Sequence, residues 1–185
     1  KGMDKVFKGL KKSEQITAKA VNATSRDFKS RAPSWISQEV NKQYTIKKKD
    51  VATSKKGTRV KGKVKVAGVV LDNTEIQYIG TVLTPTHFKM TPRVRPKKSH
   101  YVVNVEIMRG KKKSLPSNVF LGGTGSDIQI PFRRETKRRL PIKALKTISV
   151  PQMITQQKVS KNIQKRITVE LDKRLEHNLQ RFSKK

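Results

Sequence analysis

The chain carries a large excess of positive charge. Its 185 residues include 44 lysines and arginines but only 13 aspartates and glutamates, which gives a formal net charge of +31. Charge of one sign on a compact body repels itself, so the folded chain needs a counter-charge from outside. Nucleic acid, an acidic membrane surface and acidic partner subunits can each supply one. Phosphate backbones are the commonest source, because every neutralised phosphate releases a condensed counterion.

The composition is that of a folded protein with no visible membrane segment. Valine, isoleucine, leucine and phenylalanine make up about a quarter of the chain, above the rough 20% floor associated with disorder. No apolar run approaches the roughly 20 residues that span a bilayer, and no apolar segment follows the basic N-terminus as in a secretory signal. We therefore expect no membrane partner. The absence of cysteine excludes disulfides and thiolate metal sites.

The hydrophobic pattern divides one domain into three parts. Residues 1–57 show helical spacing, residues 58–149 form a strand-rich basic core, and residues 150–185 return to helical spacing. We expect an α+β fold with N-terminal helices, a small, mainly antiparallel β-sheet in the middle and a long C-terminal helix.

Two breaks are expected in the N-terminal part. Proline disrupts a helix interior, so Pro33 predicts the end of a first helix. Ser34 is a suitable N-cap for a second helix over residues 35–40. The run Lys47–Val51 then predicts a short helical turn with a basic face.

Four strands are predicted in the middle part. Residues 60–66 alternate apolar with basic or small residues, and residues 100–107, 118–121 and 127–132 are rich in β-branched and aromatic residues. The glycine-rich segment 122–126 lacks the lysine-serine/threonine ending of a phosphate-binding loop, and a strand follows it. We interpret it as a hairpin connection.

The C-terminal helix has an apolar residue at every fourth position. Each four-residue step turns about 40° past a full circle, so the apolar stripe winds around the helix. Such a helix contacts different neighbours along its length; one straight helix that caps the sheet is the alternative. The stripe consists of Val159, Ile163, Ile167, Leu171, Leu175 and Leu179.

Basic residues cluster at five places, four of them near predicted strand ends or loops, where long side chains can reach a common groove. Such clusters bind phosphate backbones independently of sequence, with an affinity that falls steeply with salt. A set of unrelated solvated loops is the alternative. The candidate polyanion-binding residues are Lys47, Lys48, Lys49, Arg93, Arg95, Lys97, Lys98, Lys111, Lys112, Lys113, Arg133, Arg134, Lys137, Arg138 and Arg139.

Motifs that recognise a particular nucleic-acid sequence are not found. The chain has no zinc-finger spacing, no basic-leucine-zipper heptads and no aromatic ribonucleoprotein motif. Aromatic residues make up only 5% of the chain, too few to predict a base-stacking sheet. We assign Tyr101, Phe120 and Phe132 to the core.

The sequence contains no recognisable catalytic or metal-binding arrangement. His87, His100 and His177 are the only histidines, and none has a second histidine at ligand spacing. No serine, histidine and carboxylate form a nucleophile pattern, and the carboxylates are too sparse to suggest a paired site. We expect a protein that is not an enzyme and that binds no metal or cofactor.

Two segments resemble the prophage minor tail protein Z family, the tail-completion proteins of long, non-contractile-tailed phages. They are residues 139–153, RLPIKALKTISVPQM, and residues 174–182, RLEHNLQRF. The Leu-Pro-Ile and Ser-Val-Pro-Gln-Met pieces are the most specific. The order of parts is also similar, with a basic turn at 44–50 and a proline-then-phenylalanine stretch at 84–89. The resemblance covers about Val21 to Phe182, although Gly68 to Val82 departs from the pattern of the family.

The resemblance implies a structural virion protein without catalysis. Such a protein acts late in tail assembly, at the head-proximal end of the tail (the neck), and assembles in the host cytoplasm. It implies a homo-oligomeric ring of six copies that matches the symmetry of the tail, since closed symmetry satisfies one interface repeatedly. Its partners would be tail-terminator, tape-measure or connector proteins and the end of the packaged DNA.

Two other functions are compatible with the charge. A ribosomal-type or other RNA- or DNA-binding scaffold protein would share the basic composition and the helix-sheet-helix order. A nuclease or other DNA-processing enzyme with an unrecognised site is the second alternative.

Overall fold

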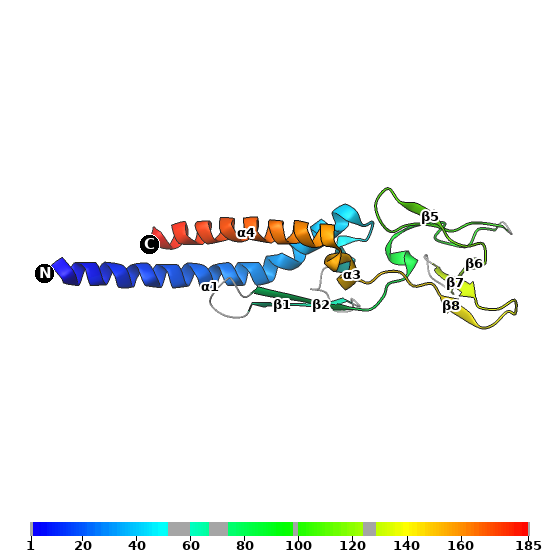
Figure 1. Ribbon diagram of the computed structural model, residues 1–185, viewed down its shortest axis with the longest axis horizontal. Coiled ribbons are helices and arrows are strands. Elements are labelled where there is room, and N and C mark those ends of the chain that lie inside the picture. Colours follow the sequence, from blue (N-terminus) through cyan, green and yellow to red (C-terminus); the bar gives the residue numbers. More distant parts are fainter. Residues whose placement is uncertain (1, 52–59, 67–73, 98–99, 124–128, 185) are drawn as a thin grey trace.

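The computed structural model of the chain describes residues 2–51, 60–66, 74–97, 100–123 and 129–184. Figure 1 shows an elongated molecule in which two long helices lie side by side; a two-stranded antiparallel sheet runs alongside the first helix, and two further small sheets follow beyond one end of the pair. We call the two helices the helical arm, and the described part of residues 83–149 the β head. The predicted α+β class, with its helices before and after the strands, is confirmed.

The helical arm pairs α1 (Gly2–Gln43) with α4 (Gln157–Ser183). The prediction that Pro33 ends the first helix is wrong, because α1 continues through it. Proline removes one backbone hydrogen bond and crowds the preceding turn. Packing across the proline offsets this cost, since Phe28 and Trp35 lie on either side of it with ring centroids 6.1 Å apart. Both side chains are buried together with Ala32.

A buried polar contact joins the two helices farther along the arm. Asn178 is 2% exposed and donates a hydrogen bond from Nδ2 to Oγ1 of Thr24, at 3.1 Å. The Thr24 hydroxyl in turn donates to the carbonyl of Ala20 at 2.8 Å. Since a buried amide is costly unless it is hydrogen-bonded, this contact favours one register of α1 against α4.

Replacing Asn178 by alanine is expected to lower the free energy of unfolding by about 1.5 kcal/mol, from a lost buried hydrogen bond and a small cavity. Urea denaturation of the folded chain measures this. Lys173, an exposed residue of the same helix, is the control, and its alanine variant should stay within about 0.5 kcal/mol of wild type. Equal effects of the two substitutions would contradict a role of Asn178 in the arm.

The C-terminal helix is divided in two, contrary to the single helix that its pattern predicts. Ser149 and Gln152 form a capping box at the start of α3 (Val150–Thr155), and Gln156 then leaves the helical conformation with a ψ of 126°. The Gln156 side chain accepts a hydrogen bond from the backbone N–H of Val159 and so caps α4. The break lets both helices direct apolar residues into the same core.

The winding stripe on α4 contacts different neighbours along its length, as predicted. Val159 and Ile163 are buried in the main core. Ile167 and Leu171 pack against the Phe28 cluster of α1. The alternative, a straight helix capping the sheet, is therefore wrong.

The strands form three small antiparallel sheets instead of one. The first pairs β1 (Val60–Val66) with β2 (Thr74–Gly80), and the second has the order β3-β4-β5, from Lys89–Thr91, Asn104–Glu106 and Lys112–Ser114. The third has the order β6-β7-β8, from Val119–Gly122, Ile130–Arg134 and Ile142–Ala144. The 3-10 helix η2 (Pro85–His87) precedes β3, and α2 (Lys48–Val51) follows α1.

Strand prediction found some strands and missed others, among them the seven-residue β2. Residues 60–66 are confirmed as β1, the basic turn as α2, and the strands on either side of the glycine-rich segment pair as β6 and β7. Residues 124–128 of that segment lie outside the described residues. The predicted strand 100–107 is wrong in its first half, since only Asn104–Glu106 pairs. Tyr101 instead reaches the third sheet, where its hydroxyl accepts a hydrogen bond from the backbone N–H of Leu121 at 2.9 Å.

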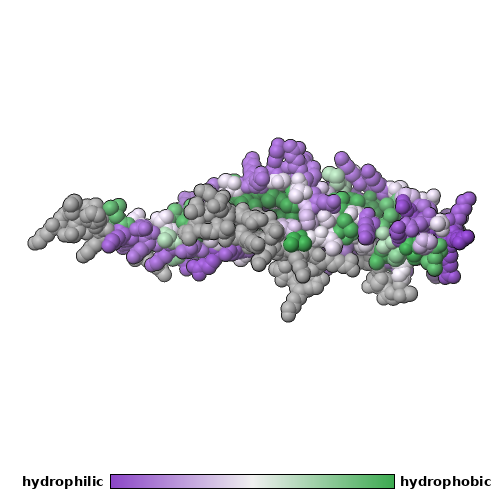
Figure 2. Space-filling model, turned by 60° about the horizontal axis from the view of Figure 1, so that its bottom comes forward, coloured by the Kyte–Doolittle hydropathy of each residue, from purple (hydrophilic) through white to green (hydrophobic). Residues whose placement is uncertain are grey.

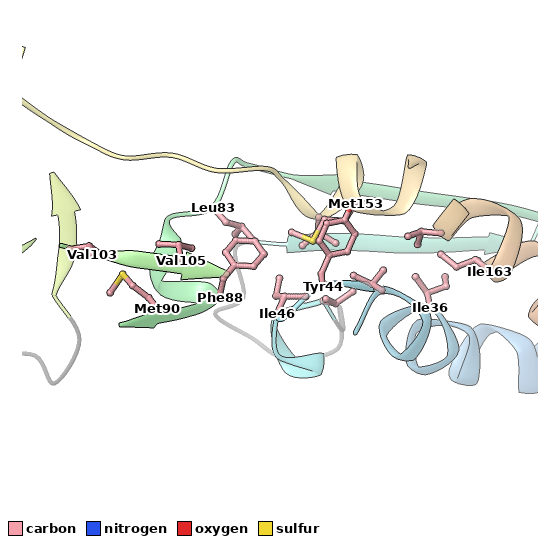
Figure 3. Packing of buried hydrophobic residues seen from close by; sticks show 14 of the residues in the cluster. Ile36, Tyr44, Ile46, Leu83, Phe88, Met90, Val103, Val105, Met153 and Ile163 are labelled. Carbon is pink, nitrogen blue, oxygen red and sulfur yellow. The ribbon is translucent and has the colours of Figure 1, made fainter. Parts of the chain in front are cut away.

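The main core lies where arm and head meet (Figure 3). Ile36 enters it from α1, Tyr44 from the segment that follows α1, Met153 from α3, and Phe88 and Val105 from the β head. Backbone contacts hold the same junction, since Tyr44 forms a β-bridge with Met108. The β head is therefore fixed to the end of the arm. Among the described residues, no helix is both long and apolar enough to cross a membrane.

Candidate polyanion-binding cleft

An open cleft of about 1200 Å³ lies over the β6-β7-β8 sheet. Figure 2 shows hydrophilic and hydrophobic side chains gathered together at the end of the molecule formed by the β head. The cleft combines both kinds, with cations and aromatic rings in its lining. Its lining residues are Arg95, His100, Tyr101, Ser117, Asn118, Val119, Phe120, Arg134, Glu135, Thr136, Lys137, Arg139, Leu140 and Ile142.

The floor of the cleft is one face of the sheet. Phe120 of β6 lies directly opposite Phe132 of β7, and Arg134 of β7 lies opposite Ile142 of β8. Because alternate residues of a strand point to the same face, all four lie on one side of the sheet. Arg133 belongs to the other side. Alternation along β7 therefore separates two neighbouring arginines, and only Arg134 lines the cleft.

One wall comes from the segment between β3 and β4. The backbone N–H of Arg95 donates to Oε1 of Gln129 at 2.9 Å, and the N–H of Gln129 donates to the carbonyl of Arg93 at the same distance. These bonds attach the wall to the residue just before β7. Tyr101, held by its bond to Leu121, fixes the wall to β6.

The opposite wall is the connection between β7 and β8. The N–H of Glu135 donates to the carbonyl of Pro141 at 3.3 Å, and the Glu135 carboxylate forms an ion pair with Lys143. Between these fixed ends the connection places Lys137 and Arg139 on the cleft.

The cations of the cleft have no carboxylate partner among the described residues. Across the described residues, the ion pairs join Glu39 to Lys42 and Arg166, Asp50 to His87, Glu106 to Lys89, and Glu135 to Lys143. Glu135 is the carboxylate that lines the cleft, and Lys143 already neutralises it. The charge of Arg95, Arg134, Lys137 and Arg139 therefore faces the open cleft without a counter-charge from the part of the chain that the structure describes.

The structure brings together members of three of the five predicted clusters. Arg95, Arg134, Lys137 and Arg139 line the cleft, whereas Arg93, Lys97, Arg133 and Arg138 are exposed near it in the chain without lining it. Lys98 lies outside the described residues. The predicted common groove is therefore formed by residues of these three clusters.

The other two clusters lie at the junction of arm and head. Lys47 and Lys111 are each three residues from the Tyr44–Met108 bridge, and Lys48, Lys49, Lys112 and Lys113 follow them, all exposed.

The turn before Lys111 is held by Glu106, which accepts a hydrogen bond from the N–H of Gly110 at 2.8 Å. This hydrogen bond, together with Lys89, lowers the pKa of the Glu106 carboxyl. Gly110 has a φ of +75°, which favours glycine there.

Assignment of the three aromatic residues to the core is wrong in part. Tyr101, Phe120 and Phe132 are half-buried, and the first two line the cleft. The guanidinium of Arg134 lies over the Phe120 ring, 5.3 Å from its centroid. Leu140, which is 65% exposed, was not expected at a site either. The signal available in the sequence was the placement of Phe120 in one predicted strand and of Arg134 two residues after the next one, 127–132.

Within the described ranges, no three histidine, cysteine, aspartate or glutamate residues gather as a group that could hold a metal ion. The chain was compared with models of protein families, with curated proteins and with solved structures. None of the three comparisons found a match.

Proposed function

We propose that this chain is a structural protein of a phage virion, a tail-completion protein at the head-proximal end of the tail. Its basic side chains meet DNA or acidic surfaces of neighbouring subunits. The observation that carries the binding role is the convergence of Arg95, Arg134, Lys137 and Arg139 on one open cleft without an internal carboxylate partner among the described residues. The resemblance of residues 139–153 and 174–182 to tail-completion proteins supports the place in the virion.

The resembling segment occupies an informative place in the fold. It begins at Arg139 and Leu140 in the lining of the cleft, continues as β8, and ends in the capped helix α3. Met153, its last residue, is fully buried in the main core. A single segment thus links the basic cleft to the junction with the arm, as expected of a part whose geometry matters to assembly.

The physical role we propose is charge compensation. The sequence between residues 83 and 149 contains 16 lysines and arginines but only three carboxylates. Bringing copies of it together in a ring concentrates this charge, and a polyanion in the ring would offset the repulsion. A passive, non-catalytic protein fulfils this role. The ring of six copies is the part of the proposal that comes from the resemblance.

We expect the isolated protein to bind duplex DNA without sequence preference and with a steep salt dependence. The affinity should fall by orders of magnitude between roughly 50 and 200 mM salt, because binding releases counterions. Fluorescence anisotropy with two duplexes of unrelated sequence measures both properties. A sequence-specific affinity, or one that salt leaves unchanged, would contradict the charge-based mechanism.

The place in the virion needs its own test. Purified virions should contain the protein, and a density map of the neck should show its helical arm. Its absence from purified virions would overturn the assignment to the tail. The same experiment does not depend on whether the cleft contacts DNA or an acidic protein.

A ribosomal-type RNA-binding scaffold protein is the second candidate. The aromatic rings of Tyr101 and Phe120 in the cleft favour it, since single-stranded RNA is commonly bound by stacking. Co-sedimentation with ribosomes that is lost after ribonuclease treatment would support this candidate against the virion protein.

A further inference from the structure

Two stacked aromatic rings and a guanidinium lie on the face of the sheet that forms the floor of the cleft. The rings of Phe120 and Phe132 are 6.1 Å apart at 27°, and the Arg134 guanidinium lies 5.3 Å from the Phe120 centroid. Cross-strand pairing holds the two rings in place, since Phe120 and Phe132 are direct partners in the ladder. The stack is therefore built into the sheet and does not depend on a flexible loop.

We propose that this stack is a platform for an unpaired base, and that the cleft binds a short single-stranded segment of nucleic acid. Arg134 and Phe120 would support the base, while Arg95, Lys137 and Arg139 would bind phosphates on either side. The inference rests on the proposed polyanion-binding function and names its ligand.

The chemistry of the lining distinguishes a single strand from a duplex. A duplex keeps its bases stacked on each other and offers phosphates to a backbone-binding surface, for which cations alone suffice. Single strands expose base faces, which stack on aromatic rings and on guanidinium planes. Phe120, Tyr101 and Arg134 line the same cleft as the phosphate-binding cations, which is the combination that a single strand uses.

Hydrogen bonds and an ion pair within the chain attach the walls of the cleft to the sheet. Arg95 is attached through Gln129, Tyr101 through Leu121, and the Lys137–Arg139 wall through the Glu135–Lys143 pair. A rigid site loses less conformational entropy on binding than a flexible one. An acidic peptide would use the same charges but would gain nothing from the stack, so we favour nucleic acid.

Arg134→Lys tests the platform, because it keeps the charge and removes the planar guanidinium. We expect the affinity for a labelled single strand of about eight nucleotides, a length within the usual site sizes, to fall about tenfold. The affinity for a duplex of equal length should stay within about twofold of wild type, since phosphate binding depends on the retained charge. Phe120→Leu, which removes the ring and keeps an apolar side chain, should have the same selective effect.

Arg133→Lys is the matched control. Arg133 is the neighbour of Arg134 on β7, is exposed, and points to the face of the sheet away from the cleft floor. This variant should leave both affinities unchanged. Circular dichroism and urea denaturation of all three variants establish that each remains folded.

The outcomes separate this inference from the proposed function. Equal losses with Arg134→Lys and Arg133→Lys, or no preference for the single strand, would overturn the platform and leave salt-dependent DNA binding intact. Binding of polyglutamate but of neither oligonucleotide would also overturn the platform. That result would indicate acidic subunits as the partner in the proposed function. Failure to bind any polyanion would overturn both.

Discussion

Replacing Arg166 by methionine is expected to lower the free energy of unfolding by about 3 kcal/mol, the range measured when one partner of a buried ion pair is removed. Arg166 of α4 donates from Nη1 to Oε1 of Glu39 on α1 at 2.7 Å, and from Nη2 to Oε1 of Gln38 at 2.6 Å. Glu39 is only 5% exposed. The variant would leave this carboxylate in the arm with Lys42 alone, which lies 2.8 Å from it.

Lys42→Met is the control for this prediction. The Lys42 side chain is 63% exposed, against 26% for Arg166, and solvent screens an exposed ion pair. We expect Lys42→Met to cost less than about 1 kcal/mol. Adding Glu39→Gln to Arg166→Met should recover part of the loss, because the amide removes the buried charge. Urea denaturation of wild type, Arg166→Met, Glu39→Gln and the double variant gives the coupling energy between Arg166 and Glu39. Equal costs for Arg166→Met and Lys42→Met would contradict the role of Arg166.

The same ion pair predicts a dependence on pH. Burial opposes ionisation of Glu39, but hydrogen bonds from Lys42 and Arg166 outweigh it and hold the pKa of the carboxyl below its ordinary value of 4.5. A lowered carboxyl pKa stabilises the folded state above the unfolded-state value, and the contribution is lost as the pH falls through the folded-state pKa. The difference in stability between wild type and Arg166→Met should therefore be largest near neutral pH. It should shrink when the pH falls below 4.5, as urea denaturation at several pH values would show.

The element types of this fold could be predicted where local pattern decides them. The long apolar spacing of α1 and α4 and the alternation in β1 are properties of each segment alone. The three-residue strands β3, β5 and β8 could not be found, because strands this short carry no alternation. Lys112-Lys113-Ser114, all exposed, forms β5 only because β4 offers it a partner.

Two errors in the prediction of helix ends have different causes. Pro33 has the local signal of a helix end, but the packing of Phe28, Ala32 and Trp35 against α4 keeps α1 continuous. The opposite happened at Gln156, where an uninterrupted helical pattern is divided. The capping box at Ser149 and the cap at Gln156 start two separate helices there. The packing against α4 is not visible in the sequence next to Pro33, whereas the caps at Ser149 and Gln156 are local signals that the continuous apolar pattern concealed.

The candidate site was predictable in its residue types and only partly in its position. Basic clusters near strand ends predicted Arg95, Arg134, Lys137 and Arg139 as candidates, together with others that lie elsewhere. Which clusters meet depends on the β6-β7-β8 pairing and on the bond between Arg95 and Gln129. The Arg95–Gln129 bond joins residues 34 positions apart, and no periodicity in the sequence predicts it.

Replacing Arg95, Arg134, Lys137 and Arg139 together by glutamine is expected to weaken duplex DNA binding about a thousandfold near 0.1 M salt. The four residues come from a loop wall, the sheet floor and the β7–β8 connection, and they face one cleft. If each binds a phosphate, each contributes about 0.9 to the slope of log affinity against log salt. The slope should therefore become less steep by about three to four. Anisotropy titrations over a range of salt concentrations measure both quantities.

A control variant that loses the same number of positive charges elsewhere tests whether the position of these charges matters. Lys47, Lys48, Lys49 and Lys111→Gln removes the same four charges from the junction of arm and head, away from the cleft lining. If the cleft holds the polyanion, this variant should lose less than about tenfold and keep most of the slope, since distant exposed charges are screened beyond a Debye length of about 10 Å. Equal losses in the two variants would mean that DNA responds to net charge alone. In that case the convergence of the four cations would have no functional consequence, and the junction clusters would be equal candidates for the contact.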